Sequence, residues 1–236
     1  MKRRLTRENA AEAVLLPLAF FLIFVLPVLV GEAPPVLTAS GLAGFVAAHM
    51  AGLGKRKNDA GPGTVTLEPL STAHLPGLER LWSDPAVIRY TSIGEPCDAG
   101  AAAHRFYRLR SCQTALSGPV IFAVLRDGRF CGVAGCPPVD AEKGTFGLFY
   151  QLQRSVWGQG IGKTAARLAL DELYRLAPSA VVYADAAAEN TASVRILEHL
   201  GFARTAVHPG AFQRDGRALD IWEYTLRPDM KEEERL

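Results

Sequence analysis

Residues 150–165 read YQLQRSVWGQGIGKTA, and this stretch decides how the rest of the 236-residue chain is interpreted. An apolar segment of strand type, 145–152, runs into the glycine-rich segment 157–164. Apolar residues then recur at helical spacing, at Ala165, Leu168, Ala169, Leu173 and Leu176. A strand followed by a glycine turn and a helix is typical of an anion site, because unpaired N–H groups and the positive helix end converge there.

Several kinds of site share this arrangement. A Walker P-loop requires a glycine five positions before Gly162, where this chain has Trp157, so only the tail of that motif is present. A Rossmann fingerprint fits better, since Gly160, Gly162 and Ala165 match its spacing and Asp185 follows about 20 residues later. However, that motif opens a doubly wound sheet, whereas this segment lies late in the chain. A glycine turn without a ligand is a further alternative.

Outward from this segment, the residue pattern predicts a mixed α/β domain. Strands are expected at 64–70, 120–126, 130–135, 145–152, 180–184, 211–214 and 218–226. Helices are expected at 74–82, 98–113 and 191–200 and directly after the glycine segment. Asp98 is the expected N-cap of the second helix, and Gly201 closes the last one. Asp127-Gly128 and Asp215-Gly216 predict two hairpins.

The glycine segment resembles the Q/R-x-x-G-x-G/A pyrophosphate loop of the GNAT superfamily of N-acyltransferases, with Trp157 in place of the first Gln/Arg. Its WGQG form is typical of the RimJ/RimL-like branch, which acetylates ribosomal-protein N-termini. A second motif lies at the family's spacing, because 189–193 leading into 196–202 is similar to that branch's N-x-x-S…L-x-x-x-G-F helix. The opening at 67–70 and the closing hairpin are similar as well, so the resemblance spans Thr64 to about Pro228.

This resemblance implies an α/β GNAT fold, with a mixed, mostly antiparallel central sheet that is splayed at the acyl-CoA site and flanked by helices. It implies acetyl-CoA as the acyl donor and no metal. The pyrophosphate would be held by Trp157, Gly158, Gln159, Gly160, Ile161, Gly162 and Lys163. The pantetheine arm would follow the strand edge at Phe149, Tyr150, Gln151 and Leu152.

The resemblance also assigns the catalytic roles. Asn190 would hold the pantetheine or the local loop, and Ser193 would lie near the thiol and protonate it. The alternative for Ser193 is a first-turn residue that satisfies the helix end. The general base is not carried over, because the stretch 211–213, where some relatives have a glutamate, reads Ala-Phe-Gln. His208, Glu95 or a water relay are the candidates, and an ordinary surface role is the alternative for His208.

The first quarter of the chain has a different character. Residues 13–30 are 18 consecutive uncharged, almost wholly apolar positions, which as a helix span about 27 Å, close to the thickness of a hydrocarbon core. A transmembrane helix is therefore expected over about 13–31. A cleaved secretory signal is the alternative, since Lys2, Arg3 and Arg4 form a basic start, but the apolar run exceeds the usual h-region.

A weaker uncharged stretch predicts a second membrane helix at about 34–54. Its small residues suit close packing against another membrane helix. Basic residues precede the first segment and recur at 55–57, so the positive-inside rule favours a hairpin with both ends in the cytoplasm. A single span followed by a flexible Gly/Ala linker is the alternative.

Charge and cysteine usage agree with this division. Residues 1–57 carry seven basic and three acidic residues, a balance of +4, whereas the remaining 19 basic and 21 acidic residues give −2. The body of the chain therefore lacks a positive field for nucleic acid. The four cysteines include no C-x-x-C, so neither a zinc site nor a disulfide framework is indicated, and they suit a reducing cytoplasm.

The sequence thus predicts a membrane anchor at 1–57, a linker at 58–63, a GNAT domain at 64–228 and a charged tail at 229–236. The expected function is acetyl-CoA-dependent N-acetyl transfer to a primary amine, by direct attack in a ternary complex, on the cytoplasmic side of the cell membrane. The alternative is a catalytically silent acyl-CoA-binding sensor or scaffold. The expected partners are acetyl-CoA, membrane lipid and an amine acceptor, either a protein N-terminus or a small molecule. Neither the acceptor nor the oligomeric state is predicted, although loops 93–103 and 208–217 are expected to select the acceptor.

Overall fold

The computed structural model describes residues 58–59, 63–112 and 116–228. The predicted membrane helices at 13–31 and 34–54, and the predicted charged tail at 229–236, lie outside the described residues. Within the described ranges, no helix combines the length and the apolar character needed to span a membrane.

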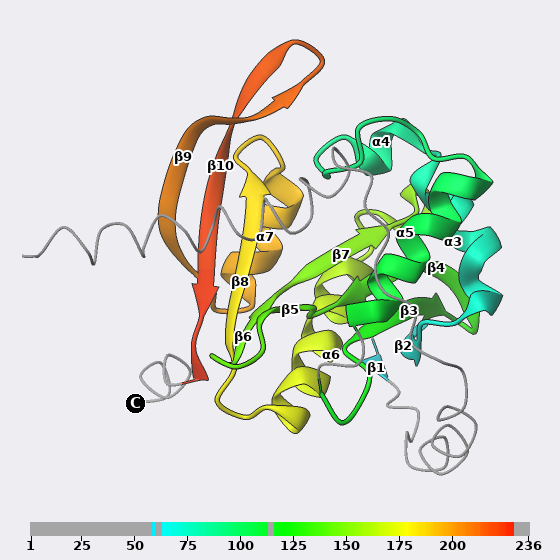
Figure 1. Ribbon diagram of the computed structural model, residues 1–236, viewed down its shortest axis with the longest axis horizontal. Helices are drawn as coiled ribbons and strands as arrows, with labels where there is room; N and C mark the ends of the chain where they lie inside the picture. The colour runs from blue at the N-terminus through cyan, green and yellow to red at the C-terminus, as the bar shows by residue number, and fades with distance from the viewer. Residues whose placement is uncertain (1–57, 60–62, 113–115, 229–236) are drawn as a thin grey trace, which may run out of the picture. The chain divides into compact units, whose positions relative to one another are not determined.

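The described strands form two sheets of five strands each (Figure 1). The first sheet has the order β1 (Asn58–Asp59), β2 (Thr64–Pro69), β3 (Ile121–Arg126), β4 (Arg129–Gly135) and β7 (Phe149–Leu152). The second has the order β5 (Pro138–Asp140), β6 (Thr145–Gly147), β8 (Val181–Ala187), β10 (Arg217–Leu226) and β9 (Ala203–Arg214). Among these strands, only β6 and β8 pair in parallel. The expected mixed, mostly antiparallel arrangement is confirmed.

Helices lie on both faces of the first sheet. The 3-10 turn η2 (Thr72–His74) leads into α3 (Leu75–Trp82), which packs on β4 and on α5 (Ala99–Ser111). On the other face, α6 (Ile161–Leu176) packs on β2, β3, β4 and β7 (Figure 1). The short helix α4 (Pro85–Ile88) follows α3, and α7 (Thr191–His199) packs on α6 and on β8 of the second sheet.

The helix ends follow from their capping residues. Asp98 Oδ1 accepts a hydrogen bond from the Ala101 amide at 2.8 Å, which confirms the predicted N-cap of α5. Asp84 caps α4 in the same way, with its Oδ1 accepting from the Ala86 amide at 2.9 Å, so a second short helix starts soon after α3 ends. Gly201 has a φ of 83° and closes α7, and the Phe202 amide donates to the Leu197 carbonyl at 3.0 Å.

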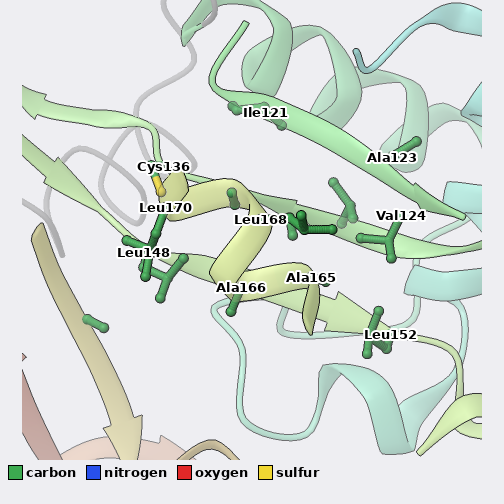
Figure 2. Close-up of a cluster of buried hydrophobic side chains, with 14 of the residues drawn as sticks. Ile121, Ala123, Val124, Cys136, Leu148, Leu152, Ala165, Ala166, Leu168 and Leu170 are labelled. Carbon is green, nitrogen blue, oxygen red and sulfur yellow. The ribbon is translucent and has the colours of Figure 1, made fainter. Parts of the chain in front are cut away.

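Alanines on the inner face of α6 bring this helix close to the sheet. Ala165 and Ala166 are both fully buried, and Figure 2 shows them with Leu168 and Leu170 among side chains of the neighbouring strands. Small side chains allow a short distance between helix and sheet, and the flanking leucines fill the remaining volume. The position of the N-terminus of α6 relative to β7 is therefore fixed by the core.

One expected strand, 145–152, is two strands in the structure. Thr145–Gly147 pairs with β8 of the second sheet, whereas Phe149–Leu152 pairs with β4 of the first. Leu148 lies between them, and its amide donates to the Tyr183 carbonyl at 2.8 Å. The prediction of a continuous strand was wrong because an apolar strand pattern does not reveal a change of pairing partner.

Other boundaries also differ from expectation. Strand β9 begins at Ala203 rather than 211, because it pairs along the length of β10, and β8 continues to Ala187. The predicted linker 58–63 begins with β1, which pairs with β2. The short strand β5 was not expected. In each case the pairing partner, and not the local pattern, sets the extent of the strand.

Candidate active site

The two sheets separate between β7 and β8, and we call this place the split. Strand β6 pairs with β8 as far as Gly147 and Tyr183. After that pair the chain continues as β7 along β4, so β7 and the second half of β8 belong to different sheets. In Figure 1 the two strands diverge from their common start beside β6. Their facing edges have no ladder partner in the described part of the chain, so the edge of β7 can accept an extended ligand.

A left-handed glycine turn joins β7 to α6. Gly158 and Gly160 have φ values of 72° and 76°, a conformation that glycine adopts without steric cost. Gly160 is the N-cap of α6 and has no side chain to occupy the helix end. The first intrahelical bond runs from the Thr164 amide to the Gly160 carbonyl at 3.1 Å. The amides before Thr164 are therefore the ones that an anion at this helix end would reach.

The larger side chains of this loop brace it. Trp157 Nε1 donates to the Leu152 carbonyl at 2.8 Å, which ties the loop to the end of β7. Gln159 Nε2 donates to the Ser155 carbonyl at 2.9 Å, and Arg126 donates to the Gln159 side-chain oxygen. The predicted cofactor contacts of Trp157 and Gln159 stay predictions, but these bonds show that both side chains hold the backbone in place.

The residues of β7 alternate between the two faces of the sheet. Gln151 accepts a hydrogen bond from Trp82 Nε1 of α3 at 2.6 Å, whereas Leu152 lies on the opposite face, near α6. On that face, Tyr150 Oη donates to the Ser193 carbonyl of α7 at 3.4 Å, across the split. Burial raises the pKa of Tyr150 to about 12, so its phenol is neutral at physiological pH.

Asn190 and Ser193 begin α7. Asn190 is the N-cap, and its Oδ1 accepts a hydrogen bond from the Ser193 amide at 3.3 Å. The helix-end role that was the alternative for Ser193 thus falls to the Asn190 side chain. In the described part of the chain, no hydrogen bond engages the Ser193 hydroxyl, and the residue is half-buried. The structure brings Ser193 next to Tyr150 at the split, and its role near the thiol stays a prediction.

A polar cluster, Asp185, Glu223 and His208, lies on the second sheet beside the split. Asp185 and Glu223 are cross-strand partners on β8 and β10, so their side chains share one face. Glu223 is held by His208 Nε2 at 3.4 Å and by Thr205 Oγ1 at 3.0 Å. His208, a candidate base from sequence, is therefore a partner of Glu223 in the structure.

Asp185 differs from Glu223 in its surroundings. No hydrogen bond or ion pair engages its carboxylate within the described ranges, and the residue is exposed. Its carboxyl group nevertheless lies among the atoms of neighbouring strands, and this desolvation raises its pKa to about 6. The Glu223 carboxylate adds to the rise, whereas His208 opposes it.

The cluster faces away from α7. Ala184, the neighbour of Asp185, pairs with Tyr224, and both are buried. Tyr224 is close enough to Glu198 of α7 for that charge to help raise its pKa, after the larger effect of desolvation. Successive strand residues point to opposite faces, so Asp185 and Glu223 lie on the face opposite α7.

Arg214 joins the two loops that were expected to select the acceptor. Its Nη1 donates to the Gly94 carbonyl at 2.7 Å, and its Nη2 donates to the carbonyls of Thr91 at 2.8 Å and Ile93 at 2.7 Å. A longer bond of 3.4 Å reaches the Ile88 carbonyl. One guanidinium at the end of β9 thus fixes the segment 88–94, which we call the acceptor loop.

Sequence reasoning missed both Asp185 as a site residue and Arg214. The signal for Asp185 was a single charge within the apolar strand segment AVVYADAA, where a carboxylate is unusual. Arg214 gave no signal, because its partners are backbone carbonyls about 120 residues earlier. Glu95, another candidate base, is an exposed residue directly after the acceptor loop.

Two other features lie outside this site. The four cysteines are free, and burial raises the pKa of Cys131 to about 11 and that of Cys136 further, so these two thiols stay protonated. A surface hollow lined by 178–179, Val181 and 227–228 lies at the start of β8, away from the split.

Comparison with known proteins agrees with this geometry. Residues 64–203 match the family model described as an acetyltransferase (GNAT) domain. The chain is 23% identical over 163 residues to the uncharacterised N-acetyltransferase p20 of Bacillus licheniformis, covering 69% of this chain and 92% of that protein.

Two solved structures share the fold. YncA of Salmonella typhimurium, with its cofactor acetyl-CoA, is 22% identical with a TM-score of 0.59, covering 70% of this chain and 94% of that one. The ribosomal-protein-alanine N-acetyltransferase of Brucella melitensis is 22% identical with a TM-score of 0.58, covering 68% and 98%. With the family model spanning more than half of its length, the chain belongs to the GNAT family of acetyltransferases.

Proposed function

We propose that this protein moves an acetyl group from acetyl-CoA to a primary amine, by direct attack in a ternary complex. The observation that carries this proposal is the split, because it leads from the unpaired edge of β7 directly into the glycine turn of α6. This arrangement offers one continuous path for a long donor molecule with an anionic middle and a reactive end.

Backbone groups supply most of the donor site in this proposal. The pyrophosphate binds the amides of residues 158–163, where the turn and the helix dipole favour negative charge. The pantetheine arm adds to the edge of β7 over Phe149–Leu152 as an extra strand would. Both contacts use main-chain atoms, so the fold itself provides them.

The leaving thiolate needs a proton. Ser193 has a hydroxyl at the start of α7, on the α6 and α7 side of the split, and the Asn190 cap and the Tyr150 bond fix the turn that carries it. We assign Ser193 as the proton donor and Asn190 as the residue that orients it. Tyr150, with its raised pKa, serves as a neutral brace.

The acceptor is proposed to be a protein N-terminus or a small amine, by analogy with the RimJ/RimL-like branch. The WGQG loop and the Asn190–Ser193 spacing support this branch, as does the likeness in fold to the Brucella enzyme. The acceptor enters between the polar cluster and the acceptor loop, which Arg214 holds together with the final hairpin.

A second candidate function is a silent acyl-CoA-binding sensor or scaffold. It is motivated by the stretch 211–213, which lacks the glutamate that some relatives carry before the last hairpin turn. Such a protein would bind coenzyme A at the same loop without releasing thiol.

We further propose that residues 1–57 tether the catalytic domain to the cytoplasmic side of the cell membrane. The 18-residue apolar run and the basic residues on both sides of the first quarter support this proposal. The test is a pair of reporters fused after Leu236, one active in the cytoplasm and one active only after export. Activity of the exported reporter alone contradicts the tether topology.

The enzymatic proposal is tested by incubating the full chain with acetyl-CoA and a panel of N-terminal peptides, polyamines and small amines. Release of free thiol and an acetylated acceptor in the mass spectrum are expected for at least one class. Tight coenzyme A binding in a calorimeter, with no thiol release on any amine, favours the silent binder instead.

A further inference from the structure

We infer that Asp185 is the general base of the transfer, and that Glu223 and His208 are positioning residues that keep its surroundings polar and ordered. This inference rests on the proposed acetyl transfer and supplies the residue that resemblance to the family leaves open. In this inference, the carboxylate of Asp185 accepts the proton that the attacking amine must lose.

The position of Asp185 relative to the split is the first support. The last pair of β6 with β8 involves Tyr183, so Asp185 stands two residues into the part of β8 that borders the split. It lies on the face opposite α7, whereas Ser193 belongs to α7 itself. A thioester seated in the split would thus have a proton donor on one face and a proton acceptor on the other, so that the two proton transfers of the reaction use separate residues.

The second support is the difference between the two carboxylates of the cluster. Glu223 is engaged by His208 and by Thr205, and its side chain is 14% exposed. Asp185 has no such partner within the described ranges and its residue is exposed, so a substrate amine can reach it. The charged or titratable groups on this face beside it are Glu223 of β10, His208 of β9 and Tyr183 on its own strand.

The protonation state suits this role. Partial desolvation and the Glu223 charge hold the pKa of Asp185 at about 6, above the ordinary range for aspartate. At neutral pH the carboxylate is mostly ionised, yet it is a stronger base than an ordinary aspartate. His208 opposes the rise and so limits it.

The step balances as follows. Asp185 takes one proton from the ammonium group of the acceptor, and the freed nitrogen lone pair attacks the thioester carbonyl carbon, forming the C–N bond. The tetrahedral intermediate collapses with cleavage of the C–S bond, and the leaving thiolate takes a proton from Ser193, which regains one from solvent at the same time. Asp185 then returns its proton to solvent. The amine nitrogen loses its second proton to solvent, and no oxidant or reductant takes part.

The test uses acceptors that differ in their need for a base. Asp185→Asn in the full chain is expected to lower kcat/KM at least about 100-fold for the best alkylamine acceptor of the panel. The same substitution should lower kcat/KM several times less for the trifluoroethyl-type analogue of this acceptor, because the amine of the analogue is uncharged at neutral pH. Acetyl-CoA affinity should be unchanged, and Asp140→Asn, on the edge strand β5, is the matched control.

The pH profile provides a second, independent readout. For the alkylamine acceptor, which stays protonated throughout this range, the slope of log kcat/KM against pH should steepen in the wild type below about pH 6, the pKa of Asp185, and this acid limb should be absent in Asp185→Asn. Unchanged kcat/KM and an unchanged acid limb in the folded variant overturn the inference, as does an equal loss for both acceptors. If the wild type acetylates no amine at all, the proposed function itself fails.

Discussion

The proposed donor site and the proposed acceptor site differ in the kind of groups that they offer. At the donor end, the edge of β7 and the turn before α6 offer main-chain groups, and the side chains of Trp157 and Gln159 serve to hold that backbone. On the proposed acceptor side, the groups are side chains from β8, β9 and β10, among them Asp185 and Arg214.

This difference explains why one half of the site can be recognised in sequence and the other cannot. A backbone site requires glycine at fixed positions, as at Gly158 and Gly160 with their positive φ values, and such spacing survives as a motif. A side-chain site requires only that suitable groups meet in space. Asp185, Glu223 and His208 meet through strand pairing across about 40 residues, so no short motif records them.

The largest expected effect on ligand binding comes from changing the glycine turn before α6. Gly160→Val forces a β-branched residue into the left-handed region at the N-cap of α6, which costs about 1–2 kcal/mol and displaces the amides. Acetyl-CoA should then bind at least about tenfold more weakly by calorimetry.

The matched control for the donor turn is Gly144→Val. Gly144 also has a positive φ, 66°, and lies in the turn between β5 and β6. The Gly144→Val variant should lose about as much stability as Gly160→Val and keep its affinity for acetyl-CoA. Equal weakening of binding in both variants would show that the donor site does not depend on the backbone of this turn.

The next largest effect is expected at the acceptor loop. Arg214→Lys replaces a planar fork, which bonds to several carbonyls at once, by a single ammonium. The acceptor KM should rise about tenfold, and acetyl-CoA affinity should stay the same.

Arg175→Lys is the control for Arg214, since Arg175 pairs with Glu172 on the surface of α6. It should change neither constant. If Arg214→Lys weakens the binding of acetyl-CoA and of the acceptor equally, the hydrogen bonds of Arg214 support the whole fold and do not set the geometry of the acceptor site.

A smaller effect distinguishes the role of Asn190 as the N-cap of α7 from its proposed contact with the donor. Asn190→Ala removes the N-cap of α7 and should lower the free energy of unfolding by about 1 kcal/mol, measured in urea. Asn190→Asp keeps the cap and should restore stability. If the aspartate variant is stable but binds acetyl-CoA poorly, the amide contacts the donor in addition to capping the helix.

The smallest effect concerns stability and pH. Because the pKa of Asp185 is raised to about 6 in the fold, above its value in the unfolded chain, the folded state binds more protons between about pH 4 and 6. Wild-type stability should therefore fall as pH rises through that window. Solvent screening at this exposed residue limits the effect to about 1 kcal/mol or less.

Asp185→Asn should remove this pH dependence and unfold at a slightly higher urea concentration than the wild type at pH 7. A variant that is both more stable and less active indicates a residue retained for function and not for the fold. Identical urea midpoints for the two proteins at pH 7 and at pH 4 would contradict the raised pKa.

The sequence predicts local features of the fold well where the signal is itself local. The hairpin at Asp127-Gly128, the cap at Asp98 and the close of α7 at Gly201 all depend on a few neighbouring residues, and the structure confirms them. The break at Leu148 was not predictable, because the residues on both sides are apolar and of strand type while the partner strand changes.

The same limit applies to the site. The spacing of the sequence motifs located the glycine turn and the start of α7. The hydrogen bonds of Arg214, in contrast, go to backbone carbonyl groups, which every residue has. The only sequence signal for Asp185 is a single charge in an apolar strand segment, and nothing in the sequence connects it with Glu223 or His208. On the proposed acceptor side, the residues are therefore brought together by pairing between strands that are distant in sequence, and not by a local pattern.

The most direct test of the central claim is a crystal structure of the protein with bound acetyl-CoA. The prediction is that the pyrophosphate contacts the amides of 158–163, the pantetheine follows β7 through the split, and the thioester lies between Ser193 and Asp185. Acetyl-CoA bound outside the split, or a thioester that lies away from both residues, would contradict the account.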